Sequence, residues 1–463
     1  MSSLDAIIIG GGIAGLSAAY ELLRRDIGFV VLERASRPGG VILSEEIDGF
    51  TIDAGPDSLL VQKPDGIRLC EELGLGTELV STKPPRLAYI QRGGRLHPLP
   101  ASSVLGIPTR IGPFVTTGLF SWGGKLRMAA EIGIPARRDE ADESIGAFMT
   151  RRFGGEATTY LGEPLLAGIH AGDVNRLSVR SLFPRLVDAE REYGSLLRAF
   201  RARPRGPGSA NGAFRSLPGG LSQMIRTLVA RLPTGSVRLN AAVRRVSIGE
   251  TPPRFSVEIA DGEGISASAV ICATPAYVTA ALLREIDPGL AGLCGDVPYA
   301  STATVIMAFE RSEIAHTLNG SGFVVPRVER SGILAGSWMS SKWPHRAPAG
   351  KVLLRAFVGG ARDPQALDRS DAELVGASLT ALTPLLGITG PPLLTRVYRW
   401  ERASAQHEVG HDARVRAIDQ ALVRRPGVFV TGSGFRGVGI PDCVADGRAT
   451  GKQVAEWLAR RSS

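Results

Sequence analysis

The stretch AIIIGGGIAGLSAAYELLRRDIGFVVLERASRPGG, residues 6–40, decides the fold of this 463-residue chain. Four apolar residues at its start predict a buried parallel strand, because both faces of such a strand lie in the core. Apolar residues at helical intervals then predict a helix, and a second apolar run, residues 29–32, predicts another strand. Together they form a βαβ unit, which predicts an α/β protein with a Rossmann-type domain.

Three glycines between the first strand and the helix, Gly10, Gly12 and Gly15, follow the Gly-x-Gly-x-x-Gly pattern. Such glycines let the backbone turn tightly and let a pyrophosphate approach, while the helix N-terminus offers N–H groups to the phosphates. Glu33 ends the second strand 18 positions after Gly15, close to the roughly 20 at which a carboxylate binds adenosine ribose hydroxyls. A carboxylate there favours FAD or NAD over NADP; the alternative is an ordinary glycine-rich turn.

The composition is that of a basic globular protein. It is 44% hydrophobic, and 54 Lys and Arg residues against 45 Asp and Glu residues give a formal charge of +9. The basic residues form no long block with interleaved aromatic residues, which argues against a nucleic-acid partner. The positive excess suits an anionic substrate or an anionic membrane surface, although a basic soluble protein without such partners has the same charge.

The four cysteines stand far apart in the sequence, and no Cys-x-x-Cys pair occurs. We therefore expect no metal site, no disulfide framework, and a reducing, cytoplasmic location. The first strand begins so close to residue 1 that a signal peptide has no room. No apolar run reaches the roughly 18 residues that predict a membrane-spanning helix.

The middle of the chain carries two further predicted regions. Residues 47–52 and 86–99 are typical of hairpins, and Arg86, at a strand start, is either a solvated strand end or an anchor for a substrate carboxylate. From about residue 100 to 215 the pattern is helical, and its mixture of aromatic residues and cations suits either a bilayer surface or a helical core. Strand-like runs and one helix then predict an inserted antiparallel sheet: residues 303–309, 322–325, 333–339, 351–359 and, for the helix, 371–386.

The end of the chain contains a second glycine-rich segment. Residues 428–431 predict a strand, four glycines follow between positions 432 and 439, and residues 444–458 predict an amphipathic helix. A helix aimed at this loop would stabilise negative charge on a reduced flavin. A domain that binds only NAD has no need of this second element, so the predicted cofactor becomes FAD.

Several motifs together resemble those of the protoporphyrinogen oxidases, oxygen-dependent FAD enzymes of haem biosynthesis in the monoamine-oxidase-like flavoprotein group. GGGIAGLSAAYEL and ERASRPGG are shared by the whole group, whereas AGIHAGD, residues 167–173, and GFRGVGIPDC, residues 434–443, are much more particular to these oxidases. The resemblance extends from about residue 5 to 459. It implies a FAD-binding domain over residues 1–85, 216–295 and 396–463, a substrate domain over 86–98 and 296–395, and a helical, membrane-associating domain over 99–215.

The same resemblance implies where FAD and the substrate bind. Arg86 would bind a propionate, and Gly172 would direct its carbonyl at the reactive face of the flavin. The pocket would be lined by Val324, Trp338 and Phe357, of which Trp338 is bulkier than expected, and His407 stands where an aromatic residue is common. The implied contacts of non-covalent FAD are Gly10, Gly11, Gly12, Ile13, Ala14, Gly15, Glu33, Val41, Gly55, Pro56, Asp57, Ser58, Val243, Ser433, Val438, Gly439 and Ile440.

The implied reaction converts protoporphyrinogen IX to protoporphyrin IX by three hydride transfers to the flavin, while three dioxygen molecules become hydrogen peroxide. No His–Asp pair shares a motif, so we nominate no general base. Coproporphyrinogen III is the nearest alternative substrate, and it carries four propionates instead of two. Further alternatives are a flavin amine oxidase, a carotenoid desaturase and a non-catalytic, membrane-peripheral flavin-binding partner protein. A homodimer and peripheral attachment to the inner face of the cell membrane stay open.

Overall fold

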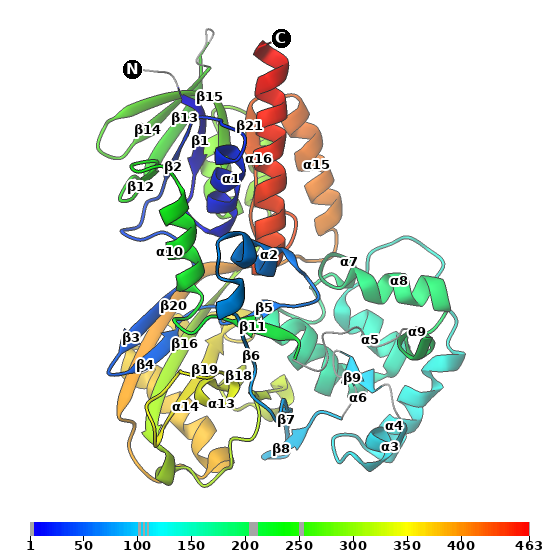
Figure 1. Ribbon diagram of the computed structural model, residues 1–463. Coiled ribbons are helices and arrows are strands. Elements are labelled where there is room, and N and C mark those ends of the chain that lie inside the picture. The colour runs from blue at the N-terminus through cyan, green and yellow to red at the C-terminus, as the bar shows by residue number, and fades with distance from the viewer. Residues whose placement is uncertain are drawn as a thin grey trace.

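The computed structural model describes residues 4–100, 103–104, 107–108, 111–202, 212–249 and 254–462. Figure 1 shows three regions. The first is a sheet flanked by long helices, and it contains both the N-terminal and the C-terminal part of the chain. The second is another sheet with a helix on one side, and the third is a group of short helices beside that second sheet. Within the described residues, no helix combines the length and the apolar character needed to cross a membrane.

The first sheet contains the predicted βαβ unit and confirms it. Its strand order is β12-β2-β1-β15-β14-β13, with β21 paired to β15. β1 pairs in parallel with β2 and β15, and β15 with β21, so the carboxyl ends of these four strands share one edge. The strands are β1 (Leu4–Ile9), β2 (Phe29–Leu32), β12 (Val237–Arg238), β13 (Val243–Ile248), β14 (Phe255–Ile259), β15 (Gly264–Cys272) and β21 (Val428–Val430).

The first and last long helices of the chain pack against each other. A Cβ at Gly447 would lie 2.2 Å from the Ala14 carbonyl oxygen, and one at Gly451 would lie 2.8 Å from the Ala18 carbonyl oxygen. Only glycine allows the two backbones to come this close. The last helix also extends beyond the predicted residues 444–458 at both ends. The helices on this side of the sheet are α1 (Ile13–Leu23), α2 (Asp65–Glu72), α10 (Ser222–Arg231) and α16 (Ile440–Ser462).

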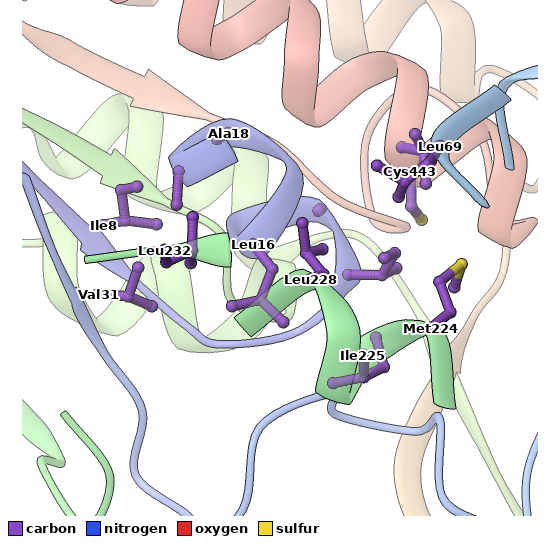
Figure 2. Close-up of a cluster of buried hydrophobic side chains, with 14 of the residues drawn as sticks. Ile8, Leu16, Ala18, Val31, Leu69, Met224, Ile225, Leu228, Leu232 and Cys443 are labelled. Atoms are coloured by element: carbon purple, nitrogen blue, oxygen red, sulfur yellow. The ribbon is translucent and has the colours of Figure 1, made fainter. Parts of the chain in front are cut away.

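One hydrophobic core joins these four helices to the sheet. Figure 2 shows Leu16 of α1 beside Leu228 of α10, and Cys443 of α16 beside Leu69 of α2. All four side chains are buried. Full burial of one leucine contributes about 1.5–3 kcal/mol to stability, so this core holds the turn after β1 rigidly between sheet and helices.

The second sheet has the strand order β20-β16-β19-β18-β17-β7-β8. The predicted antiparallel sheet is confirmed except where β17 pairs with β7 in parallel. Helix α14 (Asp371–Leu386) has the predicted bounds, starts at a capping box of Ser370 and Glu373, and covers one face of the sheet. The strands are β7 (Ala88–Arg92), β8 (Arg95–Pro98), β16 (Tyr299–Glu310), β17 (Gly322–Val324), β18 (Ala335–Trp338), β19 (Lys351–Gly359) and β20 (Leu394–Ala405).

Strand β20 crosses a predicted domain boundary. It begins at Leu394, before the predicted start of the last FAD-binding segment at residue 396, and it pairs with β16 along its length. By its hydrogen bonds the strand therefore belongs to the second sheet. The two predicted hairpins are confirmed, as β3 (Ser44–Ile47) with β4 (Phe50–Asp53) and as β7 with β8.

The third region has its own hydrophobic core and contains a buried ion pair. Arg152 Nε donates to Glu131 Oε1 at 2.8 Å, and Ser195 Oγ donates to Glu131 Oε2 at 2.5 Å. Both charged side chains are 0% exposed, and removing one partner of such a pair costs about 3–5 kcal/mol. The helices of this region include α4 (Trp122–Ala129), α5 (Ile145–Phe153), α7 (Val179–Leu182), α8 (Pro184–Tyr193) and α9 (Leu196–Ala202), of which α5, α8 and α9 contact the ion pair.

Candidate functional site

The turn after β1 is shaped by its glycines. Gly10 has a φ of +109°, and its N–H donates to the Leu32 carbonyl at 2.8 Å. A Cβ at Gly15 would lie 2.0 Å from the Gly10 carbonyl oxygen, whereas a Cβ at Gly12 would meet no described atom within 4 Å. Gly12 is the N-cap of α1 and brings no capping side chain. This open space at a helix N-terminus fits the phosphate role predicted for residues 10–15.

Glu33 lies against the same turn. Its Oε2 accepts a hydrogen bond from Gly11 N at 2.7 Å, and its Oε1 accepts one from Ala35 N at 2.8 Å. Val243 lies near Glu33 in the fold. Ala241, two residues before Val243, donates its N–H to the Glu33 carbonyl at 2.8 Å. The residues predicted to contact ribose and adenine thus lie close together, and they fit an adenine nucleotide.

The predicted contacts Val41 and Gly55 also meet. A Cβ at Gly55 would lie 1.9 Å from the Val41 carbonyl oxygen, so this approach requires glycine. The Val41 side chain is 41% exposed, and Trp400 of β20 donates its Nε1–H to the Ala54 carbonyl at 3.1 Å. The segment therefore lies where the two sheets meet.

Asp57 joins this segment to the second sheet. Its carboxylate accepts hydrogen bonds from Lys342 Nζ at 2.8 Å and from Trp343 Nε1 at 3.1 Å, and it pairs with Arg355 at 3.2 Å. Burial acts to raise the pKa of Asp57, but the two cations outweigh burial and hold that pKa well below its usual range. Sequence analysis missed Lys342 and Arg355, because no local pattern links Asp57 to Lys342, 285 residues away, or to Arg355, which is farther still.

The second glycine-rich segment lies beside the first. A Cβ at Gly432 would lie 3.9 Å from the Ala14 Cβ. Asp446 of α16 holds the segment at its start, accepting hydrogen bonds from Thr431 Oγ1 at 2.6 Å and from Gly432 N at 3.1 Å. Because α16 begins at Ile440, the positive end of its dipole lies at the predicted flavin contacts Val438–Ile440.

Gly172 leaves no room for a side chain. A Cβ there would lie 2.4 Å from Leu177 Cδ1 and 2.5 Å from Gln406 Oε1. The preceding residue, Ala171, has a φ of +52°, and its carbonyl accepts a hydrogen bond from Ala361 N at 2.8 Å. Arg86 is exposed just before β7, where its Nε donates to the Thr82 carbonyl at 3.1 Å.

The structure separates the three residues predicted to line the substrate pocket. Val324 and Phe357 both pair with Ala335, so their side chains share one face of the sheet. Trp338 is 1% exposed and packs in the core under α14, on the opposite face. The prediction that Trp338 lines the same pocket is therefore wrong, because the alternation of side chains along β18 directs it away.

Known proteins are similar to this chain over nearly all of its length. Residues 13–455 match the family described as flavin containing amine oxidoreductase. The coproporphyrinogen III oxidase of Bacillus subtilis (strain 168) is 36% identical over 98% of each chain. The chloroplastic protoporphyrinogen oxidase of Nicotiana tabacum is 27% identical over 99% of this chain and 87% of its own. A crystal structure from Exiguobacterium sp. 255-15, named "Putative protoporphyrinogen oxidase", has a TM-score of 0.87 at 32% identity, over 98% of this chain and 99% of that one.

Two alanine substitutions in the first turn should separate folding from cofactor binding. Gly15→Ala should destabilise the fold by about 1–3 kcal/mol, because its methyl group collides with a backbone carbonyl. Gly12→Ala should leave the melting temperature of the apoprotein unchanged and weaken FAD binding, since its methyl group occupies the open space at α1. Thermal unfolding and flavin absorbance measure the two effects. Equal effects of both variants on both readouts would contradict this assignment.

Proposed function

The chain belongs to the flavin-containing amine oxidoreductase family, and on that premise we propose that it oxidises a porphyrinogen to the corresponding porphyrin in haem biosynthesis. The observation that carries the proposal is the full-length similarity to the Bacillus subtilis coproporphyrinogen III oxidase. The chain is an oxidoreductase that uses FAD, and the two glycine-rich segments, one at each end, fit that cofactor.

Coproporphyrinogen III is the substrate we favour, ahead of protoporphyrinogen IX. The Bacillus subtilis relative is 36% identical to this chain, and the tobacco protoporphyrinogen oxidase 27%. The formal charge of +9 also suits a substrate with four carboxylates better than one with two.

Different residues of the site would bind different parts of FAD and the substrate. FAD supplies the chemistry by accepting a hydride. The N–H groups at the start of α1 bind its phosphates, and Glu33 exchanges its bond to Gly11 N for the ribose hydroxyls. The N-terminus of α16 favours negative charge near Val438–Ile440. Gly172 lets the substrate ring approach closely, and Arg86 binds a propionate through a charge-assisted hydrogen bond.

The overall reaction balances as three two-electron steps. In each step the porphyrinogen loses one hydride and one proton, and one dioxygen molecule becomes hydrogen peroxide. Six electrons and six hydrogens therefore leave the tetrapyrrole, and three molecules of peroxide form. Positioning is the main contribution of the protein to such a reaction, because the driving force comes from aromatisation of the ring.

A peripheral membrane contact is also part of this proposal. Trp122 and Leu126 lie one helical turn apart on α4 and are 67% and 72% exposed. Lys125 Nζ lies 4.5 Å from the centre of the Trp122 ring and donates to the Val115 carbonyl. Lys125 is only 8% exposed, so the contact would rest on the two exposed apolar side chains, which suit the interfacial region of a bilayer.

The porphyrinogen assay tests the proposed reaction directly. Purified protein is mixed in air with coproporphyrinogen III or protoporphyrinogen IX, and porphyrin fluorescence and hydrogen peroxide are followed together. We expect faster oxidation of coproporphyrinogen III and about three peroxides per porphyrin, as the electron balance requires. Absence of porphyrin with both substrates would exclude this function.

Two further variants should affect different ligands: one should weaken substrate binding and the other should weaken FAD binding. Arg86→Ala should raise the KM for coproporphyrinogen about tenfold, through loss of one hydrogen bond to a charged group, and should keep its FAD. Glu33→Ala should lose FAD on purification, because the ribose hydroxyls have no acceptor. Each variant is the control for the other. An unchanged KM in Arg86→Ala, or full flavin content in Glu33→Ala, would refute the corresponding role.

Co-sedimentation with anionic liposomes tests the membrane contact. Trp122→Ser combined with Leu126→Ser should reduce the bound fraction several-fold, because each removes buried apolar area from the contact. Val423→Ser is the matched control, since Val423 is 81% exposed and lies in another region. Equal sedimentation of wild type and the double variant would rule out α4 as the contact.

A further inference from the structure

Two histidines lie together beneath the second glycine-rich segment. His407 follows β20, and His411 is the first residue of α15 (His411–Val423). Their rings stack with centroids 3.7 Å apart and planes inclined by 14°. The side chains are buried, at 2% and 1% exposed.

Each imidazole donates to one backbone carbonyl of the segment. His407 Nε2 donates to the Ser433 carbonyl at 2.9 Å, and His411 Nε2 donates to the Phe435 carbonyl at 2.8 Å. A carbonyl oxygen only accepts, so each ring carries a hydrogen on Nε2. The stacked pair therefore binds two alternate carbonyls of the segment that leads to the flavin contacts at residues 438–440.

The segment is anchored by the Phe435 side chain, which is 1% exposed and belongs to a hydrophobic core, as well as by hydrogen bonds. A cavity of about 260 Å³ lies against the pair and against Phe435, Arg436 and Gly437, so the segment is not packed on that side. Its glycines have no side chains with which to anchor it, and Gly432 and Gly437 have φ values of +118° and +136°. A glycine-rich backbone keeps one conformation only where its N–H and C=O groups form hydrogen bonds.

The pair is uncharged at neutral pH. Burial and the neighbouring His411 and His170 together lower the pKa of His407 to about 3, against the opposing effect of its hydrogen bond to the Ser433 carbonyl. Burial also lowers the pKa of His411, against the opposing effects of its hydrogen bond to the Phe435 carbonyl and of Asp412. Two neutral imidazoles can stack closely, whereas two imidazolium ions would repel each other.

We propose that His407 and His411 are positioning residues for the flavin: by binding the Ser433 and Phe435 carbonyls, they fix the backbone on which the isoalloxazine ring rests. The inference depends on the proposed contact of Ser433 and residues 438–440 with FAD. In the family that the sequence resembles, an aromatic residue is common at the position of His407. An aromatic ring can stack on His411, but only a side chain with an N–H can also bind the Ser433 carbonyl.

The test compares His407→Phe with His407→Gln. Phenylalanine keeps a stacked ring and removes the N–H, which leaves the Ser433 carbonyl without its donor. The Kd for FAD, measured by quenching of flavin fluorescence during titration of the apoprotein, should rise about tenfold. The midpoint potential of the bound flavin should shift as well. Glutamine restores a side-chain N–H and should recover most of the affinity. His345→Asn, at an exposed histidine with a φ of +61°, is the control and should bind FAD as wild type does.

His411→Phe repeats the test at the Phe435 carbonyl and decides the matter if His407→Phe does not fold. A folded phenylalanine variant with wild-type Kd and wild-type midpoint potential would overturn the proposal. A glutamine variant as weak as the phenylalanine variant would also overturn it. Because the titration uses no porphyrinogen, failure of this inference is distinguishable from failure of the proposed reaction.

Discussion

Close contact between the first and last helices is the constraint on which the rest of the structure depends. Gly447 brings the backbone of α16 against the carbonyl of Ala14, and no other residue would permit that distance. This contact places the two glycine-rich segments side by side at the carboxyl edge of one sheet. A cofactor bound at the first segment can therefore reach the second, and the N-terminal ends of two helices lie at one site.

A second constraint connects the cofactor region to the second sheet. The Asp57 carboxylate remains ionised at neutral pH because Lys342 and Arg355 lower its pKa more than burial raises it. Strand β20 reinforces this connection through Trp400, which binds the Ala54 carbonyl. Both interactions fix the face of the sheet that carries Val324 and Phe357 relative to the glycine turns. The two regions thus form one rigid frame around the proposed site.

Local patterns were sufficient to predict many of the elements, although not β20, and they did not predict how distant elements meet. The βαβ unit, both hairpins and α14 follow from apolar periodicity, turn residues and a capping box, all of which act within a few positions. The parallel pairing of β17 with β7 joins segments more than two hundred positions apart, and no local signal specifies it. The prediction for Trp338 failed for the same reason. Whether Trp338 faces the core or the pocket depends on which face of the sheet α14 covers, and no local pattern specifies that face. The Asp57 ion pairs and the stacked histidines likewise depend on contacts between distant segments.

The contact between α1 and α16 also has a consequence for how the protein is made. The ribosome synthesises the βαβ unit long before β21, the second glycine-rich segment and α16. During that interval a nascent chain has the first glycine-rich turn without the backbone of α16 that packs against it. The two glycine-rich segments can meet only after α16 has been made.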